Sequence, residues 1–138
     1  MSIQPRAGLP LPADPAFATR KRQVGPSTIA VSIINDRARL SGRRIFAELR
    51  WPAGQPITYT VAGHLIAIRS AHPHETRHRI SRLGQIRLPA ATRRATGIVL
   101  GDPLLLIAIP NADVVAIVPA PIVYEALSSA LALLHGAA

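Results

Sequence analysis

Cysteine is absent from the 138 residues, and aromatic side chains account for only 4% of them. The absence of thiols excludes disulfide bonds and thiolate metal sites. The sequence is nonetheless 49% hydrophobic. We therefore expect a core built from Ile, Leu, Val and Ala, with few aromatic rings.

Basic residues are absent from the C-terminal third, since no lysine or arginine follows Arg94. Residues 1–94 carry 16 basic and 4 acidic side chains, whereas residues 95–138 carry 3 acidic side chains and no basic one. Basic stretches attract nucleic acid or anionic membranes, mainly through phosphate contacts and the release of counterions. The charge pattern thus predicts one electropositive working part and one apolar structural part.

Long uninterrupted apolar runs are also missing. Residues 98–123 form the longest apolar region, but Asp, Asn and Pro residues interrupt it repeatedly, so it is not expected to span a membrane. Residues 1–26 contain five prolines and no sustained apolar core, which argues against a signal peptide. We expect a cytoplasmic protein without a membrane partner.

Catalytic patterns are not found either. The acidic residues are scattered, and there is no Gly-rich phosphate loop, no nucleophilic serine elbow and no pair of neighbouring carboxylates. His72, His74 and His78 lie near Glu75, and imidazole and carboxylate groups are good metal ligands. The segment contains a proline, however, and has no helical register that would fix the rings. We expect no enzyme, no cofactor and no metal, and interpret residues 71–78 as a His-rich linker.

What the chain does contain is a compact β-α-β-β unit at residues 79–120. Pro89 and Gly97 bracket a short helix, because Pro is favoured at the first helical position and Gly just past the end. Before it lies a loosely alternating segment, 80–88; after it come a turn at 101–103 and a hairpin of strands 104–109 and 114–118. One such unit is too small to bury its own strands, so we expect a second copy.

Residues 27–70 are interpreted as that copy, in divergent form. They contain a β-branched run at 28–34, a short segment at 37–40, a helix within 41–51 that Ser41 would cap, and a hairpin of 57–61 and 65–68. The copies align at offsets of 47 to 49, with Arg39-Leu40 on Arg87-Leu88, Ile57 on Leu104 and Ile66 on Val115. This alignment predicts an internal duplication.

The second unit resembles the AbrB/SpoVT (MazE-like) family of swapped-hairpin DNA-binding domains. The resemblance rests on Leu83-Gly84, Ile86, Leu88-Pro89, Arg93-Arg94, Gly97-Ile98 and Gly101-Asp102. Ser81 stands where the family usually has an acidic residue, and Gln85 where it usually has an arginine. A tandem pair of such units resembles the arrangement in MraZ-type regulators.

The resemblance implies a mainly β fold with short helices, in which two tandem β-α-β-β units form a swapped-hairpin, AbrB-like barrel followed by a C-terminal helix. It further implies a sequence-specific or semi-specific DNA-binding transcriptional regulator that binds double-stranded DNA in the nucleoid as a homodimer or higher homo-oligomer.

The expected DNA contacts are basic side chains of both units and of the N-terminal arm, together with Gln85, which would read an adenine edge. Arg93 and Arg94 match a basic pair of the family, so they are the first candidates for contact with DNA. The full set is Arg79, Arg82, Gln85, Arg87, Arg93, Arg94, Arg37, Arg39, Arg43, Arg44, Arg20, Lys21 and Arg22.

Two terminal segments complete the organisation. Residues 1–26 are expected to be a flexible, basic, Pro-rich arm, and residues 121–138 an apolar helix that is buried in an oligomer or, over 121–135, holds a protein partner. Two alternative functions remain open: an antitoxin that binds both DNA and a toxin, and an oligomeric assembly module that does not bind DNA.

Overall fold

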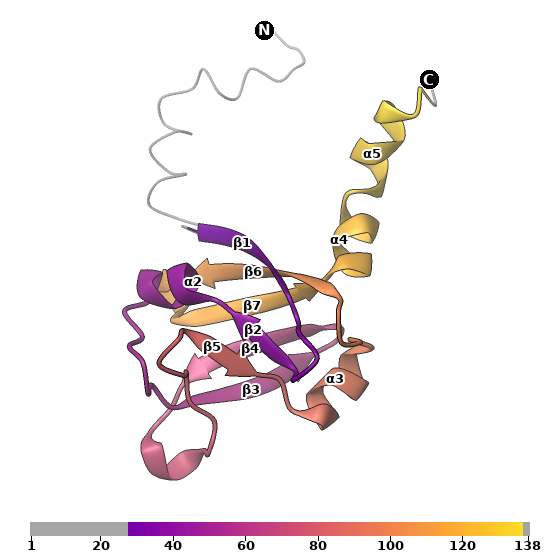
Figure 1. The fold of residues 1–138 in the computed structure, drawn as a ribbon. Coiled ribbons are helices and arrows are strands. Elements are labelled where there is room, and N and C mark those ends of the chain that lie inside the picture. Colours follow the sequence, from indigo (N-terminus) through magenta and orange to yellow (C-terminus); the bar gives the residue numbers. More distant parts are fainter. Residues whose placement is uncertain (1–27, 137–138) are drawn as a thin grey trace, which may run out of the picture.

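The chain folds into a five-stranded antiparallel sheet with a two-stranded ribbon lying across one side of it (Figure 1). The computed structural model describes residues 28–136. In the sheet the strand order is β1-β6-β7-β4-β3, and the ribbon pairs β2 with β5. The strands are β1 (Thr28–Ile33), β2 (Arg39–Ser41), β3 (Ile57–Ala62), β4 (Leu65–Ser70), β5 (Gln85–Arg87), β6 (Pro103–Ile109) and β7 (Val114–Pro119). The helices are α2 (Arg43–Glu48), α3 (Ala90–Thr96), α4 (Ala120–Ala126) and α5 (Ser128–Leu134), with 3₁₀ turns η2 (Pro73–Glu75) and η3 (Pro110–Ala112).

The expectation of a mainly β fold with short helices is confirmed. The five-stranded sheet is open, with β1 and β3 at its two ends. Both expected hairpins form, β3 with β4 and β6 with β7. The expected short helix is α3, which follows Pro89 and ends at Gly97 in the left-handed conformation (φ 73°).

The hydrogen bonds of the first half recur in the second half. The N–H of Gly101 donates to the carbonyl of Ile34, and the N–H of Gly54 donates to that of Ile80, both at 2.7 Å. At the ribbon, Gly42 donates to Gly84 (3.0 Å). Its counterpart is the bond from the Leu88 N–H to the Ala38 carbonyl (2.9 Å). The two halves are therefore related by an approximate twofold rotation, with β4 and β7 paired across the axis.

This repeat corrects one of the alignments made from the sequence. The equivalent residues of β2 and β5 are 46 apart, so Leu40 corresponds to Ile86 and not to Leu88. The offset of 47 for β3 and β6 agrees with the bonds of Gly54 and Gly101. The error arose because Arg-Leu occurs in both segments, while three-residue strands contain too little pattern to fix a register.

The core lies between the sheet and a second layer made by the ribbon and α2. Leu40 and Ile86 point inward from the ribbon at 0% and 1% exposure, and Leu106 and Ile117 face them from the sheet. The expected aliphatic composition is confirmed, since the only aromatic residues among the buried side chains of residues 28–136 are Phe46 and Trp51.

The expected cap of the first helix is wrong. Ser41 is the last residue of β2, and α2 begins at Arg43 after Gly42. A Cβ on Gly42 would lie 2.9 Å from the Phe46 ring. The chain therefore needs a glycine where it turns from strand to helix, and close packing, which a capping pattern does not reveal, places the helix start.

The segment before α3 is also shorter than expected. Only Gln85–Arg87 forms a strand there, and Leu83 lies in a turn with its side chain 71% exposed. The apolar alternation of residues 80–88 therefore does not describe one strand. It combines Ile80, which is buried, with a turn and then a second inward-facing residue, Ile86.

The C-terminal segment forms two short helices where one was expected. α4 and α5 meet at Leu127, and helical bonds continue through the junction, with the Leu127 N–H 3.0 Å from the Val123 carbonyl. Within this chain the segment is largely exposed, including Leu133 and Leu134 at 77% and 80%. Over residues 28–136, no helix has both the length and the apolar character needed to cross a membrane. The expected N-terminal arm, with Arg20, Lys21 and Arg22, lies outside the described residues.

Candidate nucleic-acid interface

The outward side of the β2–β5 ribbon is polar and basic. Because side chains alternate along a strand, burying Leu40 and Ile86 turns their neighbours toward solvent. The antiparallel register places Arg39 directly opposite Arg87, and Ser41 opposite Gln85. Like charges directly opposite each other destabilise a strand pair. An arginine pair at this position therefore favours a bound anion.

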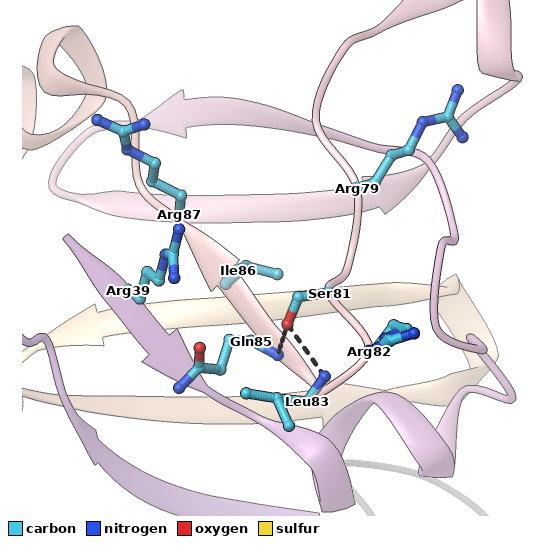
Figure 2. Close-up of a pocket in the computed structure, with 8 residues that line it drawn as sticks. All are labelled: Arg39, Arg79, Ser81, Arg82, Leu83, Gln85, Ile86 and Arg87. Carbon is cyan, nitrogen blue, oxygen red and sulfur yellow. Dashed lines mark hydrogen bonds between the residues drawn. The ribbon is translucent and has the colours of Figure 1, made fainter. Parts of the chain in front are cut away.

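The turn that leads into β5 is held by a serine hydroxyl. The Oγ of Ser81 accepts hydrogen bonds from the N–H groups of Leu83 (3.2 Å) and Gln85 (3.1 Å) (Figure 2). In the first half, the Oδ1 of Asn35 plays the same role for Arg37 and Arg39, both at 2.9 Å. Ser81 thus serves as the acceptor of this turn without adding a negative charge beside the arginines.

Gly84 closes this turn with a positive φ of 74°, and a Cβ there would lie 2.9 Å from the Cβ of Arg43 and 3.2 Å from its Cα. We expect Gly84→Ala to destabilise the protein by about 2–3 kcal/mol, because left-handed strain of about 1–2 kcal/mol adds to a steric clash with the backbone. The control is Gly63→Ala, which has a φ of 63° and no neighbour within 4 Å. Chemical denaturation would measure both, and equal losses would contradict the prediction.

A hollow of about 440 Å³ opens over the ribbon and the turn (Figure 2). Arg39 and Arg87 lie beside each other on the ribbon, and Arg79 and Arg82 line the same hollow. No acidic residue is among its lining residues, which are Arg39, Arg79, Ser81, Arg82, Leu83, Gln85, Ile86 and Arg87.

A second hollow, of about 420 Å³, adjoins the first and shares Arg79 and Arg87 with it. Arg77 and Arg93 also line this second hollow. We call the surface formed by these six arginines the basic face: Arg39, Arg77, Arg79, Arg82, Arg87 and Arg93.

The guanidinium groups of the basic face have few partners within residues 28–136. Arg79 donates from Nη1 to the Gly54 carbonyl and Arg93 from Nε to the Leu88 carbonyl, each at 3.3 Å. Within the same residues, the side chains of Arg39, Arg82 and Arg87 make no hydrogen bond or ion pair. These charges are therefore available to a ligand.

The structure gathers only part of the expected set. Arg43 lines a smaller hollow beside Arg82, whereas Arg37, Arg44 and Arg94 are exposed and line none of the described hollows. Gln85 lies in the first hollow, with its Nε2 3.5 Å from the Oγ of Ser41. The basic side chains of the two copies do not occupy equivalent positions, because Arg87 and Arg82 correspond to Ser41 and Asp36 at the offset of 46.

Arg77 was missed because its segment was interpreted as a linker. The end of that segment is fixed against β3: the Oγ1 of Thr76 donates to the Ile57 carbonyl (2.8 Å), and the Ile57 N–H donates to the His78 carbonyl (3.0 Å). At an offset of 46, residues 76–79 correspond to the second part of β1, whereas His74 and Glu75 lie in the 3₁₀ turn η2. The corrected alignment would have predicted an extended, ordered segment at this position.

Tyr59 was also missed, and it joins the sheet to the ribbon. Its hydroxyl donates to the carbonyl of Arg87 at 2.8 Å, and its ring meets that of His78 edge to face, with centroids 5.1 Å apart. Burial raises the pKa of Tyr59 above its ordinary value, because it disfavours the charged phenolate. Tyr59 therefore acts as a neutral donor that positions Arg87.

The raised pKa of Tyr59 predicts a pH effect on stability. The folded protein holds the phenolic proton more tightly than the unfolded chain, so this contribution is complete below about pH 10 and is lost as the pH rises further. We expect the free energy of unfolding to fall above about pH 10, and Tyr59→Phe to flatten that fall while costing about 1 kcal/mol at neutral pH. Chemical denaturation at neutral pH and above about pH 10 would measure the free energy of unfolding of both proteins. An equal fall in this free energy for the wild type and Tyr59→Phe would contradict the prediction.

Other chemistries receive no support from the described residues. Over residues 28–136, no three His, Cys, Asp or Glu side chains are grouped so that they could hold a metal ion. His72 and His74 stack on each other, with centroids 5.7 Å apart, and the N–H of His72 donates to Glu75. Comparison with known protein families and with curated proteins gives no match to this chain.

Proposed function

We propose that this protein binds double-stranded DNA through the basic face and acts as a transcriptional regulator. The observation that carries the proposal is the placement of Arg39 opposite Arg87, with Arg79 and Arg82 around the same hollow and no acidic residue lining it. Phosphate groups would neutralise this cluster. The role is one of binding and not of catalysis, and it would place the protein on the nucleoid in the cytoplasm.

The shape of the site favours a duplex. A two-stranded ribbon is narrow enough to enter the major groove of B-DNA, and β2 with β5 forms such a ribbon, with its polar side facing outward. Gln85 lies among the arginines. A glutamine there can contact an adenine edge with both amide atoms while neighbouring arginines contact phosphates. This division of roles supports semi-specific recognition.

The same observations support the finer proposal that the fold is of the AbrB/SpoVT swapped-hairpin type, in a tandem arrangement similar to that of MraZ-type regulators. The motif residues Gly84, Pro89 and Gly97 occupy a turn, a helix start and a helix end. The repeated hydrogen bonds and the pairing of β1 with β6 interleave the two halves of one chain. A tandem pair of swapped-hairpin units in one chain would interleave its two halves in this way.

The test is fluorescence anisotropy with a mixed-sequence duplex and with the native upstream duplex, over a salt series. Each phosphate contacted contributes about −0.9 to the slope of log affinity against log salt, so four to six contacts predict a slope of about −3.6 to −5.4. Tighter binding to the upstream duplex would add sequence readout. Failure to bind either duplex at low salt would overturn the proposal.

A further inference from the structure

The side of the five-stranded sheet that faces away from the core is apolar over β1, β6 and β7. The register places Val31, Leu105 and Val118 in one row and Ile29, Ile107 and Ala116 in the next. An antiparallel sheet with one side in water normally alternates apolar and polar residues, and these strands do not. We call this surface the outer apolar face: Ile29, Val31, Ile33, Leu105, Ile107, Ala116 and Val118.

The strongest exposure lies on the edge strand β1. Ile29, Val31 and Ile33 are 56%, 68% and 63% exposed, although each is a branched aliphatic residue. Polar residues on the same side of the sheet begin only at β4 and β3, with Arg69 and Thr60. The apolar end is therefore a bounded patch.

The C-terminal helices extend this patch and form a groove together with it. Val31 and Leu105 from the sheet line an apolar groove of about 260 Å³ together with Val123 of α4, Leu131 of α5 and Leu127 between the two helices. Beyond the groove, α5 runs away from the body of the protein (Figure 1). It ends with Leu133 and Leu134, which are 77% and 80% exposed.

We propose that a second copy of this chain covers the outer apolar face. Charge selects the face on which two copies can meet: each copy has a net charge of +9, so the copies repel each other overall, and this repulsion is weakest across a surface without charged side chains. The outer apolar face contains no charged residue, and the six arginines of the basic face lie on the other side of the core. An acidic partner protein would instead be attracted to the arginines.

The exposed apolar area also supports a second copy as the partner. Burying one large aliphatic side chain removes about 60–120 Å² of apolar surface from water. Seven side chains that are 48–80% exposed therefore offer about 400 Å²: Ile29, Val31, Ile33, Tyr124, Leu127, Leu133 and Leu134. The half-buried residues of β6 and β7 and the edge of β1 add to this, toward the roughly 800 Å² per partner of a stable interface.

Leu133 and Leu134 belong to the same chain as the groove but do not line it. α5 forms one wall of its own groove through Leu131, so Leu133 and Leu134 at its end point beyond that groove. A twofold dimer solves this, because each copy then supplies the end of α5 to the other copy's face. The proposal does not depend on DNA binding, since the dimer would form without DNA.

Sedimentation velocity of the full chain, from about 0.1 to 100 µM without DNA, tests the proposal. We expect a dimer with a Kd near or below about 1 µM. Val31→Glu should raise that Kd at least a hundredfold, because two carboxylates would be buried without partners. The control is Thr60→Glu, on the same side of the sheet but beyond the apolar patch; it should leave the dimer intact.

A second variant, Leu133→Glu/Leu134→Glu, tests the exchange of α5 and should weaken the dimer at least tenfold. Circular dichroism must show that each variant keeps its fold, as the exposure of Val31 and Leu134 leads us to expect. A wild type that stays monomeric at about 100 µM would overturn the proposal, and the face would then belong to a different protein or to residues 1–27. Retention of the dimer by Val31→Glu would overturn it equally.

Discussion

Replacing Arg79 and Arg87 together by alanine is expected to weaken binding to a mixed-sequence duplex by about ten- to a hundredfold and to reduce the salt slope by about 2. Both side chains line both hollows of the basic face, and neither has an acidic partner among residues 28–136. Removing them therefore takes away two phosphate contacts at the centre of the surface. Anisotropy over the same salt series measures the affinity and the slope.

The matched control is Arg44→Ala/Arg94→Ala, which removes the same charge from exposed helix positions that line none of the described hollows. This variant should lose less than threefold in affinity, since distant charges act only through the screened field of the protein. Equal losses for the two double variants would show that binding follows net charge, and would contradict the basic face as the contact surface. The fold should survive in both, because Arg79 contributes one long hydrogen bond to Gly54 and the Arg87 side chain contributes none within residues 28–136.

The contrast between Arg94 and Arg87 shows where the sequence is informative. Family resemblance placed Arg93 and Arg94 first, but only Arg93 reaches the basic face, because residues adjacent on a helix point in different directions. Arg87 gains its position from β2, a strand 46 residues earlier, whose Arg39 lies opposite it. Such a pairing between two three-residue strands is nonlocal, and no local pattern identifies it.

Local signals, by contrast, identified most of the secondary structure. The two hairpins and α3 were predicted because Gly, Pro and Asn residues mark their turns and caps, and these act within a few residues. The start of α2 depends on contact between Gly42 and Phe46, and the extended segment near Arg77 depends on pairing with β3. Gly42 also packs close to Leu106 of β6, which would lie 3.2 Å from an added Cβ. Both features therefore involve distant parts of the chain, which explains why the sequence interpretation missed them.

The two-sided apolar character of the sheet was visible in the sequence, but its meaning was not. β6 and β7 read as continuous aliphatic runs, and such runs are typical of strands buried on both sides. Within residues 28–136 the ribbon and α2 cover the inner side, whereas α4 and α5 cover only one end of the outer side, beside Val31 and Leu105. What lies on the outer side is therefore a question about association, which the pattern of a single chain does not answer.

The two proposals together lead to a prediction about DNA. The ribbon lies across one side of the sheet (Figure 1). The strand register and the burial pattern place the outer apolar face on the other side. A dimer formed through the outer apolar faces would thus present its two basic faces in opposite directions, and each could hold a separate duplex. We expect the wild type to bridge two duplexes, so that a biotinylated duplex on beads retains a second, fluorescent duplex only when protein is present.

Val31→Glu separates bridging from binding. This variant should bind a single short duplex within threefold of the wild type, because Val31 lies on the side of the sheet opposite the basic face, but it should retain at least tenfold less of the second duplex. Arg79→Ala/Arg87→Ala should lose both properties together, and Thr60→Glu neither. Bridging by Val31→Glu at the wild-type level would contradict the prediction, because residues 28–136 of one monomer present a single basic face.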